Sequence, residues 1–583
     1  MEMEKKNLAI IILAVVLAAS GVGNVILAIM AGFVQVAPPP GVNTIIIGYA
    51  SNPDTIDPVD TWDVPSYNVQ HQVVENLVAY NLSTHPDYQI MGVLATGWQW
   101  NGANYDNITF TLRQGVLFHD NTTFDSADVI WNFNRLTWFA NYTGDLPDNA
   151  TSWVMFPVSL YWFSDGVTQI IKDFYANDQW HVTFILNQSF APFLDLMTYT
   201  AGAILSPEAT PRYTYLDLTT GTLVGTGPFR YIGYMYDVEV RYERFDDTNQ
   251  WGYWGYWGTL PWAELLVFDI NEDDITRNMD MLALRVDYLQ GALPENLETF
   301  NESAAHIVNR FGEGLCYFYL EMYCENPNYA GGLNVTWREA LQYAVNYTYI
   351  IDEIYQSSVV RGPPAVPRLM PGHNASVQII DTDITRARTL MQQMGYGVGW
   401  DTAYPGTDEG LWTAASFRTV QLNRHYGSVN NMRMNQNMDE TFGLIGVDTF
   451  EVIRTWGDYL DTGENHPWDM EISYIGWCPD YLDAFNMLDP LFNNVSHSNF
   501  AHVNDPYLQT LFEQASAQPD VNLRRQIYMH IQSYLYEART PPHEYKWPHG
   551  VLFASLQTYV HAAYLQGVLY NSLNTLECSS MYI

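Results

Sequence analysis

The stretch Ile108–Val116, which reads ITFTLRQGV, decides the fold class of this chain. Apolar and polar residues alternate along it, and this pattern is typical of a β-strand with one buried face. The turn-forming run Phe118–Thr122 follows, and Ser126 with Asp128 then caps a helix that continues through Phe133. The sequence therefore predicts a strand, a turn and a helix in close succession here.

The pattern continues towards the N-terminus. Ile45–Ala50 is a short apolar run that predicts a buried strand, and Pro53–Pro58 is a turn-rich loop. We expect a helix around Val73–Val78, and the segment Leu94–Trp98 follows it. Strands and helices therefore mix along this part of the chain.

The composition is that of a folded, acidic protein. The chain has 583 residues, of which 48% are hydrophobic and 15% aromatic, and this length is enough for about two to four domains. The formal net charge is −39, because 64 acidic residues stand against 25 basic ones. A chain with this charge is not expected to bind nucleic acid.

The four cysteines favour disulfides over a metal site. They form no CxxC pair, and no histidine stands at metal-ligand spacing, so we expect no zinc and no cofactor. Cys316 and Cys324 lie on one apolar run and would be roughly 26 Å apart if that run is extended, too far to bridge each other.

The N-terminus predicts a membrane anchor. Lys5 and Lys6 precede an uncharged run over 7–36 that is long enough to cross a bilayer. A cleaved secretory signal is the alternative, because Ala18–Gly21 is small enough for a signal peptidase. The segment 37–43 is a proline-rich linker. We expect the rest of the chain to lie outside the cell, at the cell surface.

Eleven Asn-x-Ser/Thr motifs fit a glycosylated surface protein. The motifs begin at Asn81, Asn107, Asn121, Asn141, Asn149, Asn187, Asn301, Asn334, Asn346, Asn374 and Asn494.

A candidate ligand site lies in the stretch Ser473–Phe485, which reads SYIGWCPDYLDAF. Its apolar first half predicts a buried strand, which ends at Trp477 and continues into Asp480 and Tyr481. This order places an acid at the rim of a sheet, where ligands bind in open α/β folds. An acidic turn without function is the alternative.

Several motifs, in this order, resemble the extracellular solute-binding proteins of the dipeptide, oligopeptide and nickel family, which serve ABC importers. The likeness covers more than about 500 residues. The motifs are Ile56-Asp57-Pro58, Leu94–Trp98, Phe110–Asp120, Ser126–Val129, Gly225–Phe229, Arg277–Asn278 with Val286–Tyr288, Arg338–Val345, and Ala387–Leu390 with Gly395-Tyr396.

The resemblance implies a large periplasmic-binding-protein-like fold with two lobes. Lobe 1 would consist of subdomain I, over 44–80, 222–313 and 546–583, and subdomain II, over 81–221. Lobe 2, subdomain III, would span 314–545. Gly312 and Gly314 would form the hinge, since glycine absorbs backbone rotation; an ordinary tight turn is the alternative.

The resemblance also implies site residues. Cys316 and Cys478 would form a disulfide beside the site, which leaves Cys324 and Cys578 free or paired with each other. Asp480 matches the aspartate that holds a peptide's α-ammonium group. The other candidate ligand contacts are Tyr319, Glu321, Trp477, Tyr481 and Trp62. At Tyr474 some peptide-binding members carry an arginine, and its absence puts recognition of a peptide's C-terminus in doubt.

Aromatic residues suggest a second ligand class. Trp62 sits where other members place a polar pocket residue, and Trp251–Trp257 reads WGYWGYW. Such side chains could stack on sugar rings, although packing of a glycine-broken loop is the simpler interpretation of the second run.

The leading hypothesis is therefore a receptor that captures a solute, first of all a peptide, and delivers it to an ABC permease without chemistry. An oligosaccharide receptor and a glycosylated structural protein with this fold are alternatives. The chain lacks the common serine-hydrolase, zinc-protease and P-loop motifs. A glycosidase that uses Asp480 and Glu321 as its carboxylates stays open as an enzymatic alternative.

Overall fold

A computed structural model describes residues 42–86, 88–102, 104–141, 156–245, 261–324, 332–426, 428–537, 544–573 and 575–583. The predicted membrane anchor, most of the linker, Asn149 and the aromatic run Trp251–Trp257 lie outside the described residues. Within those ranges, no helix is both long enough and apolar enough to cross a membrane.

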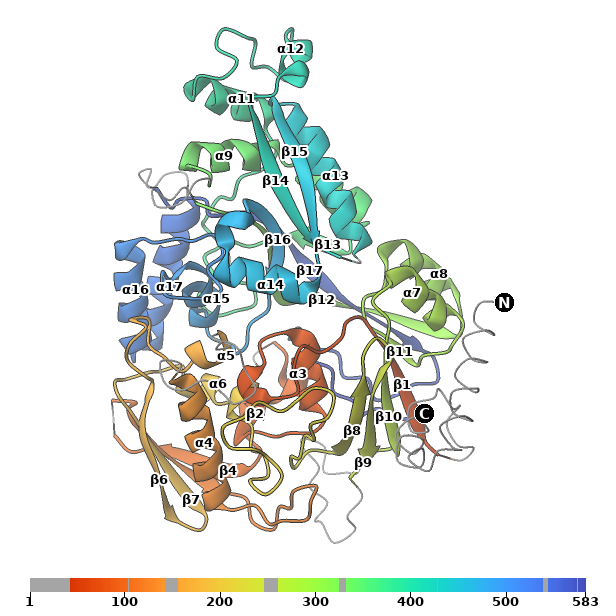
Figure 1. The fold of residues 1–583 in the computed structure, drawn as a ribbon, viewed down its shortest axis with the longest axis vertical. Helices are drawn as coiled ribbons and strands as arrows, with labels where there is room; N and C mark the ends of the chain where they lie inside the picture. Colours follow the sequence, from red (N-terminus) through yellow and green to blue (C-terminus); the bar gives the residue numbers. More distant parts are fainter. Residues whose placement is uncertain are drawn as a thin grey trace, which may run out of the picture.

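The main sheet has eleven strands and runs along the length of the molecule (Figure 1). Its order is β15-β14-β16-β12-β17-β11-β1-β10-β9-β8, and β13 also pairs with β17. The bounds are β1 Thr44–Tyr49, β8 Phe229–Met235, β9 Glu239–Arg244, β10 Leu265–Ile270, β11 Tyr288–Leu289, β12 His306–Met322, β13 Val359–Arg361, β14 Arg418–His425, β15 Val447–Arg454, β16 Ile472–Trp477 and β17 His549–Ala562.

Two long antiparallel strands connect the two ends of this sheet. β12 has 17 residues and β17 has 14, and they pair from His306 opposite Ala562 to Glu321 opposite His549. Gly312 lies in β12 with a φ of +139°, at a point where the register of this pairing shifts, and Gly314 falls in the next irregular stretch. The two glycines thus lie in an irregular part of a strand.

A second sheet of four strands, in the order β4-β5-β7-β6, lies in the lower part of Figure 1 next to α4. Its buried side chains, among them Phe110 and Phe184, pack against Phe133 of α4. The bounds are β4 Ala95–Trp100, β5 Asn107–Leu112, β6 Ile171–Asp178 and β7 His181–Leu186, with a separate hairpin of β2 Val78–Tyr80 and β3 Ile90–Gly92.

Helices cover both parts of the molecule (Figure 1). Their bounds are α3 Val64–His71, α4 Ser126–Ala140, α5 Phe156–Ser159, α6 Phe193–Leu196, α7 Asp274–Leu282, α8 Leu297–Glu302, α9 Val335–Ala344, α10 Tyr347–Tyr349, α11 Ile384–Gln393, α12 Glu409–Ala414, α13 Val429–Gly443, α14 Trp456–Asn465, α15 Phe485–Phe492, α16 Pro506–Ala517 and α17 Val521–Tyr536.

The predicted helix at α4 is confirmed, but its N-cap is Asp125. The Asp125 carboxylate accepts a hydrogen bond from the Ala127 amide at 2.7 Å, and Asp128 accepts one from the Asp125 amide at 2.8 Å. These contacts make a capping box, in which two helix-terminal donors are satisfied reciprocally.

The prediction of a helix around Val73–Val78 is wrong. The helix here is α3, which ends at His71, and β2 begins at Val78. The Val73 carbonyl accepts a hydrogen bond from the Gly227 amide at 2.9 Å, and an ideal Cβ on Gly225 would stand 2.3 Å from the same oxygen. The segment Gly225–Phe229 therefore lies directly against Val73. The Gly227 amide occupies the Val73 carbonyl, which a helix would use for its own hydrogen bond.

A buried ion pair fixes the loop that follows β1. Asp57 is fully buried, and its carboxylate accepts hydrogen bonds from both terminal nitrogens of Arg135 in α4 and from the Leu216 amide. Because the charge is paired and hydrogen-bonded, its burial is compensated. The Ile-Asp-Pro motif is thus an anchor between the loop and α4.

The Asn-x-Ser/Thr motifs occupy different environments. Asn121, Asn141, Asn187, Asn301 and Asn494 are exposed, whereas Asn81, Asn107, Asn334 and Asn346 are partly buried. Asn374 is only 4% exposed, and its side-chain amide donates to the Met529 carbonyl at 2.8 Å and to Ser533 Oγ at 3.0 Å. A glycan on Asn374 is incompatible with this packing.

Candidate ligand-binding site

The candidate site is built where β16 ends beside β12. The two strands are antiparallel, with Trp477 opposite Tyr317. A disulfide joins Cys316 to Cys478, which confirms the predicted pair and ties the loop that carries Asp480 to β12. The remaining cysteines are buried free thiols, namely Cys324 and Cys578.

Asn486 of α15 positions Asp480. The Asp480 amide donates to Asn486 Oδ1 at 2.7 Å, and Asn486 Nδ2 donates to Asp480 Oδ2 at 2.9 Å. Asn486 is fully buried and its carbonyl accepts a hydrogen bond from the Trp477 indole at 3.0 Å, so one residue orients two candidate contacts. Burial raises the pKa of Asp480 to about 7, against the opposing effect of the Asn486 hydrogen bond.

Asp480 and Trp477 line a cavity of about 330 Å³. This volume is at the lower end of the range of small-molecule pockets. One set of lining residues comes from α3 and nearby loops and the other from around β16 and α14, which lie in the lower and upper halves of Figure 1. The lining residues are Thr61–Pro65, Tyr67, Tyr80, Thr198, Tyr199, Leu573 and Thr575 in the first set, and Phe318, His425, Asn431, Trp456 and Tyr474–Asp480 in the second.

The cavity has aromatic walls and acidic polar groups. Trp62, Trp456 and Phe318 are among its aromatic side chains, and Asp63 and Asp480 are its carboxylates. Neither arginine nor lysine occurs among the described residues that line it. The arrangement can hold a ligand that is partly apolar and carries positive charge.

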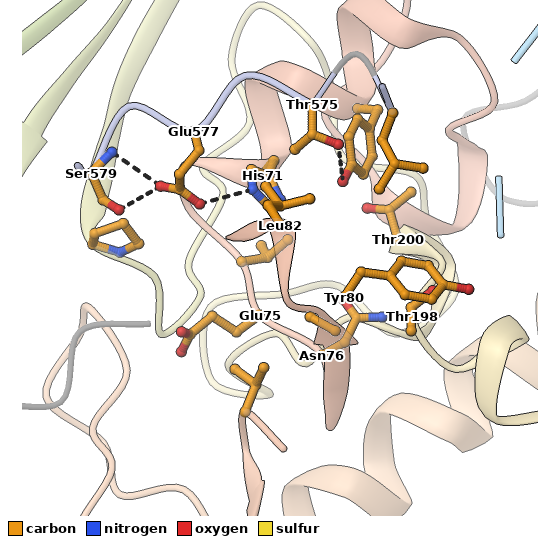
Figure 2. A pocket seen from close by; sticks show the side chains of 16 residues that line it. His71, Glu75, Asn76, Tyr80, Leu82, Thr198, Thr200, Thr575, Glu577 and Ser579 are labelled. Atoms are coloured by element: carbon orange, nitrogen blue, oxygen red, sulfur yellow. Dashed lines mark hydrogen bonds and ion pairs between the residues drawn. The ribbon is translucent and has the colours of Figure 1, made fainter. Parts of the chain in front are cut away.

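A smaller cavity of about 70 Å³, drawn in Figure 2, shares Tyr67, Tyr80, Thr198, Leu573 and Thr575 with the first. His71 Nε2 lies 3.3 Å from the Glu577 carboxylate. Although burial acts to raise the pKa of Glu577, the hydrogen bond with His71 is among the contacts that hold it below its usual value. These groups satisfy one another, so the smaller cavity carries no strong signal for a ligand.

Three predicted contacts lie elsewhere. Because side chains alternate along a strand, Phe318 of β12 faces the large cavity whereas Tyr319 and Glu321 point to the other face. The Tyr319 ring stacks on His549 with centroids 4.0 Å apart, and Glu321 accepts a hydrogen bond from the Ala501 amide at 2.7 Å. Both are about 1% exposed.

Tyr481 is also buried, and it lines a separate pocket of about 30 Å³ with Phe485 and Asp489. Of the six predicted contacts, the structure brings together Trp62, Trp477 and Asp480. The structure does not support the glycosidase alternative, because Glu321 does not line the cavity that contains Asp480 and the two carboxylates cannot act on one substrate there.

Sequence reasoning missed Asp63, Phe318, Trp456 and Tyr199 as cavity residues. Asp63 alone had a usable signal, because it precedes Val64-Pro65 as an N-cap precedes a helix with an early proline. The aromatic residues had none, since an aromatic in a strand or a helix is usually core. Across the described ranges, no group of three or more His, Cys, Asp or Glu side chains is placed to hold a metal ion.

Comparisons with known proteins agree with this architecture. A family model described as "Bacterial extracellular solute-binding proteins, family 5 Middle" matches residues 89–499, and the chain belongs to this family of binding proteins. The dipeptide-binding protein of Escherichia coli strain K12 is 26% identical over 505 residues, which cover 83% of this chain and 85% of that protein. Heme-binding protein A of Haemophilus influenzae is 25% identical over 508 residues, 84% of each chain.

A solved structure has the same fold. The periplasmic binding protein DppA of Helicobacter pylori, in complex with the peptide STSA, superposes with a TM-score of 0.76 at 20% identity and covers 93% of this chain and 98% of its own. The predicted mixed α/β periplasmic-binding-protein fold is thereby confirmed.

Proposed function

We propose that this chain is the peptide-binding component of an ABC importer. The family supports a solute-binding role, and the relative from Escherichia coli is named for dipeptides. The observation that carries the proposal is the Asp480 carboxylate, which Asn486 orients in a cavity lined by aromatic side chains.

Asp480 suits the α-ammonium group of a peptide. An ammonium that enters a desolvated cavity loses its water and needs a charged acceptor in its place. A carboxylate that is already oriented by a buried amide supplies this acceptor at little further entropic cost. The charge also argues against heme, the ligand in the name of the relative from Haemophilus influenzae, because heme carries two negative propionates and the cavity offers carboxylates.

We infer that the ligand is captured between two lobes. The lobes divide residues 44–583 at the boundaries given in the sequence analysis. The cavity takes its lining from segments on both sides of the proposed division, and β12 and β17 run across it. Rotation at Gly312 and Gly314 would open and close the site. Ligand binding would then favour the closed state by its differential contacts there.

The location of the protein is proposed by extension. An N-terminal anchor over residues 7–36 would hold the body at the cell surface beside the permease, and the exposed Asn-x-Ser/Thr motifs would carry glycans. A proteomic map of the N-terminus and of glycosylated asparagines in the native protein tests both points.

An oligosaccharide is the second candidate ligand. The observation in its favour is the aromatic lining, which includes Trp62, Trp456 and Phe318. Such rings stack on the apolar faces of sugars.

Titration calorimetry on the purified full-length protein separates these ligands. Alanyl-alanine should bind, N-acetyl-alanyl-alanine should bind at least about 100-fold more weakly, and Asp480→Asn should remove this difference, because a buried charge contact is worth about 2–5 kcal/mol. Equal binding of the two peptides would refute the role of Asp480. Binding of maltotriose and of neither peptide would transfer the assignment to sugars.

A further inference from the structure

Asp63 is a second carboxylate in the same cavity, and one of its oxygens has no partner. The residue is the N-cap of α3, where its Oδ2 accepts a hydrogen bond from the Ser66 amide at 3.1 Å. It is only 6% exposed, and Oδ1 forms no hydrogen bond with any described residue. A buried carboxylate oxygen left in this state costs free energy unless something pairs with it.

No arginine or lysine among the described residues that line the cavity supplies a positive charge for Asp63. Burial lowers the pKa of His425, which also lines the cavity, so this ring is neutral near pH 7. Burial raises the pKa of Asp63 itself to about 7, and the charge of Asp54 adds to the effect while the Ser66 hydrogen bonds oppose it. Burial, with the charge of Asp57, also raises the pKa of the nearby Asp60 to about 8.

Asp57 lies in the same loop and, in contrast to Asp63, its charge is neutralised within the protein. Six residues before Asp63, Asp57 receives the two terminal nitrogens of Arg135 and two backbone amides. The Asp63 carboxylate accepts from the Ser66 amide, its Oδ1 has no hydrogen-bond partner among the described residues, and the residue lines the cavity. This difference indicates that a ligand bound in the cavity supplies the counter-charge of Asp63.

Asp63 and Asp480 belong to one site. Both line the same cavity, and both carboxylates act electrostatically on Tyr199, which lies in its wall. A ligand with two positive charges could place one charge on each of these carboxylates. The aromatic walls suit the aliphatic stem of a long basic side chain and can also contact its cation.

We propose that the site selects peptides with a basic side chain, with Asp480 on the α-ammonium group and Asp63 on the lysine ammonium or arginine guanidinium. This inference rests on the peptide-binding function proposed above. It names dicationic peptides as the ligand class, and it assigns to Asp63 the role of a specificity-determining residue.

The test compares charged peptides with neutral counterparts of similar shape. Titration calorimetry at pH 7.5 would use lysyl-alanine and alanyl-lysine, each paired with the peptide that has norleucine in place of lysine. In the wild-type protein at least one lysine peptide should bind about tenfold or more tightly than its norleucine partner. Asp63→Asn should abolish this preference and leave the affinity for the norleucine peptides within a few-fold.

The choice of variants protects the fold. Asparagine and serine both cap helices well, so Asp63→Asn and Asp63→Ser keep a capping oxygen and remove only the charge. Asp273→Asn is the matched control, because Asp273 is an N-cap that accepts from the Thr276 amide at 2.7 Å but lies outside the cavity. The control should keep the full preference for lysine.

The outcomes separate the two proposals. Peptide binding without a preference for lysine, or a preference that survives in both Asp63 variants, would overturn this inference and leave the peptide-binding function intact. Failure of all four peptides to bind would overturn the peptide-binding function and this inference with it.

Discussion

Acidification should weaken peptide binding through Asp480. Burial raises its pKa to about 7 in the free protein, and only the ionised carboxylate pairs with an ammonium group. The affinity for the peptide should therefore be at its maximum above pH 7. It should fall about tenfold for each pH unit below 7, until the pH reaches the lower pKa that Asp480 has in the complex. At pH 5 the loss should be about 100-fold, or roughly 2.7 kcal/mol.

Unfolding is not the expected cause of this loss. A carboxyl group whose pKa is higher in the folded state than in the unfolded state binds protons more tightly when folded. Its contribution to stability is fully present below the unfolded pKa and is lost as pH rises towards 7. Protonation of Asp480 at pH 5 thus favours the folded protein while it removes the ammonium contact.

Calorimetry of alanyl-alanine between pH 5 and pH 8 measures the effect, with circular dichroism at each pH as the check on folding. The α-amino group of a peptide loses its proton near pH 8, so the optimum should lie between about pH 7 and pH 8. In Asp480→Asn the decline on the acid side should largely disappear. A wild-type affinity that stays constant from pH 7.5 to pH 5 would refute the reasoning.

Three further predictions concern stability, measured by chemical denaturation. Asp57→Asn leaves the Arg135 guanidinium buried without its counter-charge and should cost about 3–5 kcal/mol. Gly225→Ala places a methyl group 2.3 Å from a backbone carbonyl oxygen and should cost about 1–3 kcal/mol. Reduction of the Cys316–Cys478 disulfide opens a loop with a sequence separation of 162 residues, and should cost up to about 5 kcal/mol by loop-closure entropy.

Each of these has its own control. Asp273→Asn removes an exposed carboxylate and should change stability by less than about 0.5 kcal/mol. Gly395→Ala meets no atom within 4 Å and carries only the strain of a φ of +92°, so its cost should be about 1 kcal/mol. A variant with serine at Cys316 and Cys478 should not respond to reductant. A Gly225→Ala protein as stable as wild type would contradict the close packing inferred for that glycine.

Local patterns in the sequence predicted individual strands, and the family resemblance implied the fold class. The alternation of Ile108–Leu112 predicts β5 because one side of a strand faces the core, and the apolar run at Ile45 predicts β1. Pairing of Cys316 with Cys478 followed from the family resemblance. The prediction of a helix at Val73–Val78 was wrong because this segment packs against Gly225 and Gly227, which are far away in the sequence.

For the site, the sequence by itself determined the strand that ends in Trp477 and the aspartate that follows it at the rim of the sheet. Only the tertiary structure decided which other residues join Asp480. In the register that β12 adopts, Phe318 faces the cavity and Tyr319 points away from it. A shift of the register by one residue would exchange the two side chains. The fold likewise pairs Asp57 with Arg135 and leaves Asp63 facing the cavity. Charge pairing between distant segments depends on packing, and no local spacing in the chain specifies it.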